Sequence, residues 1–169
     1  MHLNEGYSYL EHLDTKARGH TVLSYLERYF THSTKEMWLE RLQRGEILLD
    51  NKVARGDEVL QASQTLVWNR PPWHEEDAPQ TFEILYQDET ILVVDKPSGL
   101  PTLPGGGFLD NTLFSFVRRE FSTAQPLHRL GRGTSGLVVF SLTSEAARDL
   151  SKRWRNHKVE KHYRALASG

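Results

Sequence analysis

The chain has 169 residues, 38% of them hydrophobic and 25% charged, with no cysteine and a net charge of −1. This length suits one ordinary domain or two small ones, and the composition excludes a disordered protein, a disulfide framework and a thiolate metal site. The apolar runs have strand length, too short to span a bilayer, and residues 1–10 lack the apolar core of a signal peptide, so we expect a cytoplasmic protein without membrane contact.

The first predicted region, residues 1–70, opens with two helices. Apolar residues recur at helical spacing from Val22 to Phe30, which predicts a helix with one apolar stripe. Ser33 is the expected N-cap of the second helix, with Glu36 as its capping-box partner and Gly45 as its C-cap. The side chains that we expect this helix to bury are Met37, Trp38, Leu39 and Leu42.

A small hairpin and a proline-rich segment follow. Residues 47–49 and 52–54 flank Asp50-Asn51, two residues that tolerate positive φ and suit a hairpin turn. A further strand is predicted at residues 65–68. Residues 71–80 contain three prolines and three successive acids without periodicity. We therefore predict a linker there, which also marks the domain boundary, and expect its acids to discourage packing.

The second region, residues 81–169, begins with two strands. They are predicted at residues 82–86 and 91–95, and the second leads into Lys96-Pro97-Ser98-Gly99-Leu100. The proline stops that strand and the glycine permits a tight turn.

A helix, a strand and a second helix complete the predicted elements. The helix from Thr112 to Phe121 places Leu113, Phe114 and Val117 on one inward face. Residues 137–140 predict a buried strand. The apolar stripe of the last helix, which begins near Thr143, consists of Ala146, Ala147, Leu150 and Trp154.

Charge is distributed unevenly along the chain. Residues 75–127 hold three Lys/Arg and nine Asp/Glu, whereas residues 128–169 hold nine Lys/Arg and three Asp/Glu. A basic segment of this kind is either a solvated helix face or a surface that contacts phosphate. We favour the phosphate contact because the segment contains the two motifs described next.

The basic segment contains His128-Arg129-Leu130-Gly131-Arg132-Gly133-Thr134-Ser135-Gly136-Leu137 and, further on, Lys161-His162-Tyr163-Arg164-Ala165-Leu166. Together with Lys96-Pro97-Ser98-Gly99-Leu100, these segments resemble three motifs of the RluA-type RNA pseudouridine synthases, the last of them a strand. The 32 residues from position 131 to Tyr163 agree with the family spacing. Two helices followed by Arg44-Gly45-Glu46-Ile47 and a hairpin also resemble the αL RNA-binding module that precedes the catalytic domain in many of these enzymes.

The resemblance implies an α+β fold, with an αL module at residues 1–70, the linker at 71–80, and the N-terminal part of a pseudouridine synthase domain at 81–169. It implies an enzyme that isomerises uridine in structured ribosomal or transfer RNA after extruding the base, as a monomer without metal or organic cofactor. The chain ends directly after the tyrosine motif, whereas family members continue with further strands. We therefore expect an incomplete catalytic domain with an exposed sheet edge.

The resemblance also implies roles for single residues. The family carries its catalytic aspartate at the position of Gly131, and glycine offers neither nucleophile nor base. Tyr163 corresponds to the tyrosine that stacks on the target uracil, and Arg129 to the arginine that fills the space left by the flipped base. The further RNA contacts that we expect are Arg132, Lys96 and Lys161, and in the first region Lys35, Arg41, Arg44 and Lys52. Pairing with an acid is an equally good interpretation of Lys96.

Two functions remain open at this point. Either the protein isomerises uridine, or Gly131 makes the same cleft a catalytically silent RNA-binding site, as in an RNA chaperone or assembly factor. A protein-interaction domain would leave both motifs and the basic end unexplained. A serine hydrolase is excluded because the nucleophile elbow needs glycine where Leu137 stands, and the histidines do not cluster at ligand spacing, with His128 expected to be structural.

Overall fold

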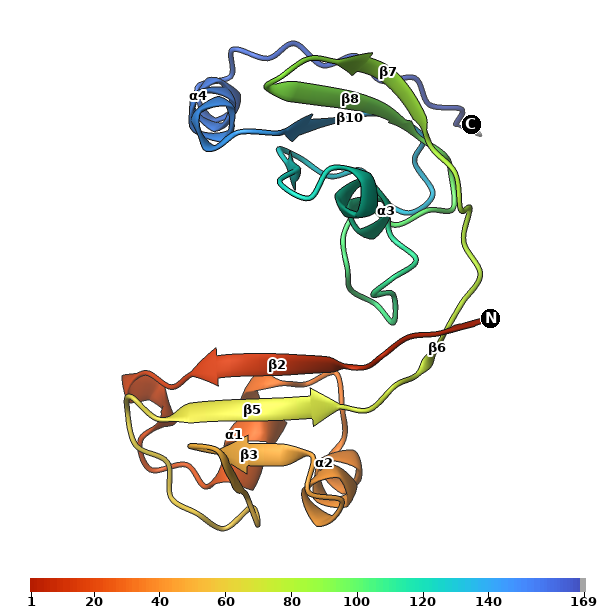
Figure 1. Cartoon of the computed structure of the whole chain (residues 1–169). Coiled ribbons are helices and arrows are strands. Elements are labelled where there is room, and N and C mark those ends of the chain that lie inside the picture. The colour runs from red at the N-terminus through yellow and green to blue at the C-terminus, as the bar shows by residue number, and fades with distance from the viewer. Residues whose placement is uncertain (168–169) are drawn as a thin grey trace. The chain divides into compact units, whose positions relative to one another are not determined.

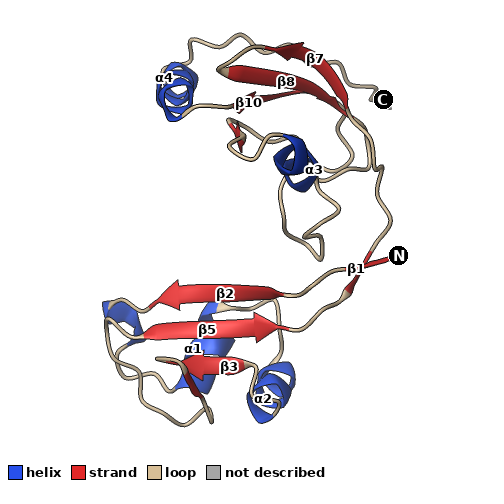
Figure 2. Cartoon of the chain, viewed as in Figure 1, coloured by secondary structure: helices blue, strands red, loops and turns tan. Residues whose placement is uncertain are grey.

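The computed structural model describes residues 1–167 and has an α+β fold, as the sequence predicts (Figures 1 and 2). The chain divides into two compact units, one of residues Leu3–Trp73 and one that begins at His74 and also includes Met1 and His2. Within the described residues, no helix combines the length and the apolar character that a membrane span requires.

The N-terminal unit, Leu3–Trp73, packs helices against a four-stranded sheet of order β2-β5-β3-β4. Its elements are β2 (Tyr7–His12), the 3-10 helix η1 (Thr15–Ala17), α1 (Val22–Tyr29), α2 (Lys35–Gln43), β3 (Ile47–Leu49), β4 (Lys52–Val53) and β5 (Thr65–Arg70). The predicted hairpin turn is confirmed, because Asp50 and Asn51 have φ values of 49° and 64°.

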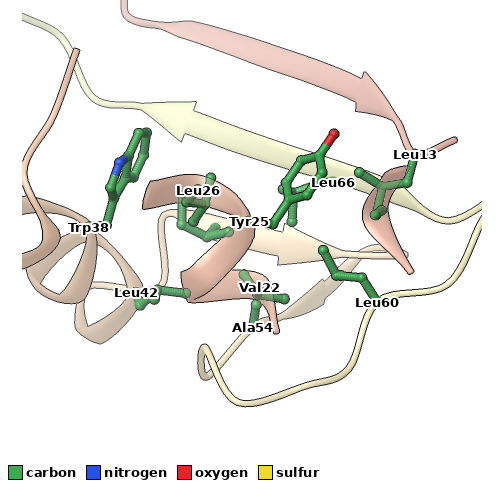
Figure 3. Packing of buried hydrophobic residues seen from close by; sticks show 11 residues of the cluster. Leu13, Val22, Tyr25, Leu26, Trp38, Leu42, Ala54, Leu60 and Leu66 are labelled. Carbon is green, nitrogen blue, oxygen red and sulfur yellow. The ribbon is translucent and has the colours of Figure 1, made fainter. Parts of the chain in front are cut away.

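Both helices turn an apolar stripe towards the sheet, and these stripes meet in one core (Figure 3). In α2 the residues that enter it are Trp38 and Leu42, one turn apart, which are 1% and 5% exposed. The buried residues of this core are Leu13, Ala17, Val22, Tyr25, Leu26, Trp38, Leu42, Ile47, Ala54, Leu60 and Leu66.

The predicted start and buried face of α2 are wrong in detail. Thr34, not Ser33, is the N-cap, and its hydroxyl accepts a hydrogen bond from Met37 N. Met37 and Leu39 are exposed, because they flank the stripe that Trp38 and Leu42 bury.

The second unit is built around a four-stranded antiparallel sheet of order β7-β8-β10-β9. Its elements are β6 (His74–Glu75), β7 (Glu83–Gln87), β8 (Ile91–Lys96), α3 (Leu113–Glu120), β9 (Gln125–Pro126), β10 (Gly136–Ser141) and α4 (Ser144–Arg155), and β6 pairs with β1 (His2–Leu3). Helix α3 packs on one face, where Leu113, Phe116 and Val117 meet apolar residues of β8 and β10. Phe116 is buried there, while Phe114, predicted to face inward, is only half-buried.

The register of the two central strands places two distant parts of the sequence together. Gly136 lies opposite Lys96, so the end of β8 and the start of β10 are neighbours. The loop that leaves β8 and the loop that enters β10 therefore begin from the same edge of the sheet.

Two further expectations for this unit are wrong. Glu75, one of the three successive acids, is fully buried, and its carboxylate accepts hydrogen bonds of 2.9 Å from the backbone N–H groups of Asp110 and Asn111. Residues 161–166, expected to form a strand, have no regular structure and are exposed, because no strand of the described residues pairs with them.

Candidate active site

The loops after β8 and before β10 are joined by hydrogen bonds into one cluster, which we call the motif cluster (residues 96–102 and 128–136). Gly99 N donates to Arg132 O at 2.7 Å, and Arg132 Nε donates back to Gly99 O at 3.1 Å. Ser98 Oγ donates to Gly133 O at 2.8 Å. Gly99 has a φ of +91°, so the turn that brings it to Arg132 favours glycine. Two segments that each resemble a family motif thus form one structure.

Lys96 stabilises this cluster from inside. Its side chain is completely buried, and Nζ donates to Pro97 O at 2.8 Å, to Leu100 O at 2.7 Å and to Arg132 O at 3.4 Å. Burial lowers the pKa of the Lys96 ammonium, although the carboxylate of Asp95 opposes that shift. The three carbonyl groups occupy its donors, so this geometry favours a structural role for Lys96 over a contact to phosphate.

The backbone is fixed on both sides of position 131. Thr102 Oγ1 donates to Leu130 O at 2.8 Å and accepts from Leu130 N at 3.1 Å. Arg132 O accepts from Gly99, and Thr134 N closes a turn by donating to Gly131 O at 3.0 Å. The residue at position 131 is therefore held in place without a side chain of its own.

Gly131 itself is exposed, and its backbone does not require glycine. Its φ lies outside the left-handed region, and a Cβ would meet only Thr134 Oγ1, at 3.6 Å, which is ordinary van der Waals contact. An aspartate at position 131 therefore fits the backbone as it stands.

Arg132 links the motif cluster to the segment before β7. Nη1 forms an ion pair of 2.9 Å with Glu76 Oε2, and the guanidinium lies 4.6 Å from the centre of the Phe108 ring. Within the described part of the chain, this is the only salt bridge that reaches residues 128–137. Both partners are substantially exposed, 47% and 72%, so Glu76 brings a solvent-accessible carboxylate to the cluster.

The fold does not bring all the other predicted site residues of this unit into the motif cluster. Arg129 is exposed two residues before position 131. Lys161 Nζ lies 4.8 Å from the ring of Trp154, which stacks on His128 at 4.6 Å. Tyr163 is 68% exposed, and among the described residues no hydrogen bond or ring contact joins it to the motif cluster.

His128 is structural, as expected. Its Nε2 accepts a hydrogen bond of 3.1 Å from Val139 N. Burial, and after it the positive charge of Lys161, lower the pKa of the ring. The neutral ring therefore anchors the start of the motif to β10 and to Trp154 of α4.

The four cations predicted in the N-terminal unit have different surroundings. Lys35 pairs with Glu27 at 3.9 Å, and Arg44 pairs with Glu40 one turn earlier in α2. Lys52 is exposed on the hairpin. The guanidinium of Arg41 lies against the rings of both Trp38 and Trp68.

Sequence reasoning missed four residues of the motif cluster and its surroundings. Thr102 and Ser98 hold its backbone, and Glu76 and Phe108 hold Arg132. In the sequence, these residues are marked only by their nearness to a motif. That nearness does not predict hydrogen bonds between residues that are about 30 or more positions apart.

Comparisons with known proteins agree with the motifs. Residues 90–168 match the family of RNA pseudouridylate synthases. An uncharacterized RNA pseudouridine synthase of Synechocystis sp. is 38% identical over 147 residues, which cover 86% of this chain and 50% of the relative. RNA pseudouridine synthase 5 of Arabidopsis thaliana is 31% identical over 99% of this chain and 54% of its own. The dual-specificity RNA pseudouridine synthase RluA of Haemophilus influenzae is 40% identical over 52% of this chain and 41% of its own.

The chain spans about half the length of the curated relatives that it matches. The similarity to the Arabidopsis protein extends over nearly the whole chain, and that to the Haemophilus protein over about half of it. With its motifs in family order and two of them joined at position 131, the chain belongs to the RluA-type RNA pseudouridine synthase family.

Proposed function

We propose that this protein is an RNA pseudouridine synthase that isomerises uridine in structured ribosomal or transfer RNA. The observation that carries this proposal is the union of two family motifs around position 131 by hydrogen bonds from Gly99, Ser98 and Thr102. The reaction breaks the bond between ribose C1′ and uracil N1 and joins C1′ to C5, so the C5 hydrogen leaves as a proton and N1 gains one. The base must leave the helical stack to be reached.

Arg129 is assigned the space that the extruded uridine leaves. Its side chain is exposed at the entrance to the fixed loop, and among the described residues it takes part in no salt bridge. A planar guanidinium can stack on neighbouring bases while it donates hydrogen bonds to them. Tyr163 keeps its proposed role of stacking on the uracil, which requires the exposed segment 160–167 to close over the bound RNA.

The isomerisation needs a carboxylate that Gly131 does not provide. Glu76 is the carboxylate that is bonded to the motif cluster, through Arg132, and it is exposed to solvent. We therefore assign the carboxylate role to Glu76. Replacement by glutamine keeps the shape and the hydrogen-bonding capacity while removing the charge, so Glu76→Gln should abolish isomerisation without loss of RNA binding.

The absence of a carboxylate at Gly131, taken by itself, favours a second function. If no carboxylate reaches the ribose, the same loops bind RNA and extrude a base without isomerising it. The protein is then a silent binder, such as an RNA chaperone or assembly factor.

Mapping pseudouridine at single-nucleotide resolution tests the proposal and finds the substrate. Unmodified ribosomal and transfer RNA transcripts are incubated with the protein, treated with a carbodiimide that marks pseudouridine, and read by primer extension. New stops at defined uridines are expected with the native protein and not with Glu76→Gln. Specific RNA binding without any new stop would replace the first function by the second.

A further inference from the structure

A pocket of about 270 Å³ lies in the N-terminal unit, between α2 and the end of β5. Its walls include Met37 of α2, Arg44 at the C-cap of that helix, Trp68 and Arg70 of β5, and Pro71. The volume is slightly below the range of about 300–1,000 Å³ that is typical of sites for small molecules. Such a pocket suits one nucleotide of a longer strand better than a large separate ligand.

Two arginines at this pocket are held by aromatic rings. The Arg41 guanidinium lies 4.4 Å from the ring centre of Trp38 and 4.1 Å from that of Trp68. The Arg70 guanidinium lies 3.5 Å from the ring centre of Trp73 and 5.8 Å from that of Trp68. Ring faces fix the plane of a guanidinium while leaving its N–H donors pointing outward.

The charge of these two arginines is not neutralised by an ion pair. None of the salt bridges among residues 1–167 includes Arg41 or Arg70, whereas Arg44 nearby pairs with Glu40. Arg41 donates one hydrogen bond, to Ser33 Oγ at 2.8 Å, out of the five donors of a guanidinium.

The two acids that line the pocket, Glu40 and Glu46, are already engaged, and Glu40 pairs with Arg44. Glu46 is 8% exposed and accepts a hydrogen bond of 3.0 Å from Trp68 Nε1. This bond fixes the indole that supports both arginines.

His32 lies next to the two arginines. Its ring stacks on Trp68, and its pKa is lowered first by burial and then by the charges of Arg41 and Arg70. An anion in the pocket would satisfy cations that the protein leaves without a carboxylate partner.

Exposed rings continue from the pocket along the sheet. Tyr9 stacks on Trp68 with a centre distance of 5.2 Å and an interplanar angle of 20°, and Tyr7 meets Tyr9 edge to face at 4.8 Å. The register pairs Tyr9 with Trp68 and Tyr7 with Arg70, so both pairs lie side by side on the sheet. Tyr7 and Tyr9 are 48% and 43% exposed.

Arginine donors beside exposed rings are the combination that binds single-stranded nucleic acid, because phosphates bind the arginines while bases stack on the rings. We infer that this pocket and the two tyrosines bind a single-stranded segment of the RNA substrate, with a phosphate at Arg41 and Arg70 and a base on Tyr7. That the ligand is RNA rests on the proposed function. The site itself rests on the geometry of the N-terminal unit.

Fluorescence anisotropy with a labelled single-stranded uridine decamer tests this site on the whole protein. Arg70→Ala and Tyr7→Leu should each weaken binding about tenfold. Arg55→Ala, which removes an exposed arginine of the same unit outside the pocket, should leave the affinity unchanged. Tyr7→Leu serves as the second variant because Arg70 also packs on Trp73, so Arg70→Ala carries the greater risk to the fold.

Three results would overturn the site. The first is that Arg70→Ala and Tyr7→Leu both bind the decamer with native affinity. The second is that Arg55→Ala loses as much affinity as they do. The third is that the native protein binds a uridine-adenosine duplex as tightly as the decamer. The proposed function fails separately. A native protein that binds the decamer but forms no pseudouridine refutes only the enzymatic proposal, whereas one that forms pseudouridine but does not bind the decamer refutes only this site.

Discussion

Two cationic side chains of each unit differ in the groups that surround their charge. In the N-terminal unit, Arg41 and Arg70 are held by tryptophan rings and have no salt bridge among the described residues. In the second unit, Lys96 is buried against carbonyl groups and Arg132 pairs with Glu76. The presence of a cationic residue in a motif therefore does not predict an RNA contact until the groups that compensate its charge are known.

The difference has a physical basis. A buried ammonium needs acceptors for its donors, and the Lys96 site provides three of them from the backbone. A guanidinium on a ring face is fixed in position yet keeps donors for a ligand. The first arrangement stabilises a loop, and the second prepares a surface for an anion.

Removing the Lys96 ammonium should have the largest effect on stability. Lys96→Met leaves the buried carbonyl of Leu100 and the partly buried one of Pro97 without a donor, whereas Arg132 O keeps the hydrogen bond from Gly99 N. Since each unsatisfied buried group costs about 1–3 kcal/mol, we expect a loss of about 3 kcal/mol in the free energy of unfolding. Urea denaturation measures it. A loss below about 1 kcal/mol would mean that the ammonium does not hold the loop.

Lys52→Met is the matched control for Lys96, because Lys52 lies exposed on the hairpin. Its replacement should change the stability by less than about 0.5 kcal/mol. It should instead weaken RNA binding and reduce the salt dependence of the affinity by about one phosphate contact. The comparison between the units would be reversed if Lys52→Met lowered the stability. It would also be reversed if only Lys96→Met changed the salt dependence of RNA binding.

Arg41→Ala should destabilise the N-terminal unit by about 2 kcal/mol, because it removes contacts with two indole faces. Thermal unfolding followed by tryptophan fluorescence reports this unit through Trp38 and Trp68. Arg41→Lys retains the charge but not the planar stack and should recover less than half of the loss. Full recovery by lysine would show that charge alone matters.

Arg129→Ala should weaken specific RNA binding about tenfold and leave stability unchanged, since the side chain is exposed. Filter binding against the mapped substrate and an unrelated RNA of equal length separates specific from general affinity. Tyr163→Phe is the companion variant. It should bind almost as well as the native protein because stacking survives. Unchanged selectivity in Arg129→Ala would remove its role in base extrusion.

Acidification should give the smallest effect. The pKa of His128 is lowered by burial and by Lys161, so it lies below the ordinary value of 6.5 in the folded protein. The unfolded chain then binds the proton more readily, and stability is full above pH 6.5 and falls as the pH drops below it. His128→Asn should flatten this fall in Tm between about pH 7 and 5, whereas His12→Asn, at an exposed position, should not. An unchanged slope in His128→Asn would contradict the role of the neutral ring.

Much of the fold could be predicted because its signals are local. The positive φ of Asp50 and Asn51 follows from their residue types, as does the turn at Gly99. The existence of the main helices follows from apolar spacing. The roles of Lys96 and Glu75 depend on acceptors and donors supplied by distant residues, which spacing does not encode. The same limit applies to the pocket, where Arg41 meets Trp68 only after the sheet has formed.

Release of tritium from RNA carrying 5-tritiated uridine tests the role of position 131 most directly, because the C5 hydrogen leaves only when the base is rejoined through C5. The native protein, Glu76→Gln and Gly131→Asp are compared on the same ribosomal and transfer RNA transcripts. We expect release by the native protein and none by Glu76→Gln. Silence of the native protein together with release by Gly131→Asp would contradict this expectation and establish a cleft that binds RNA but lacks its catalyst.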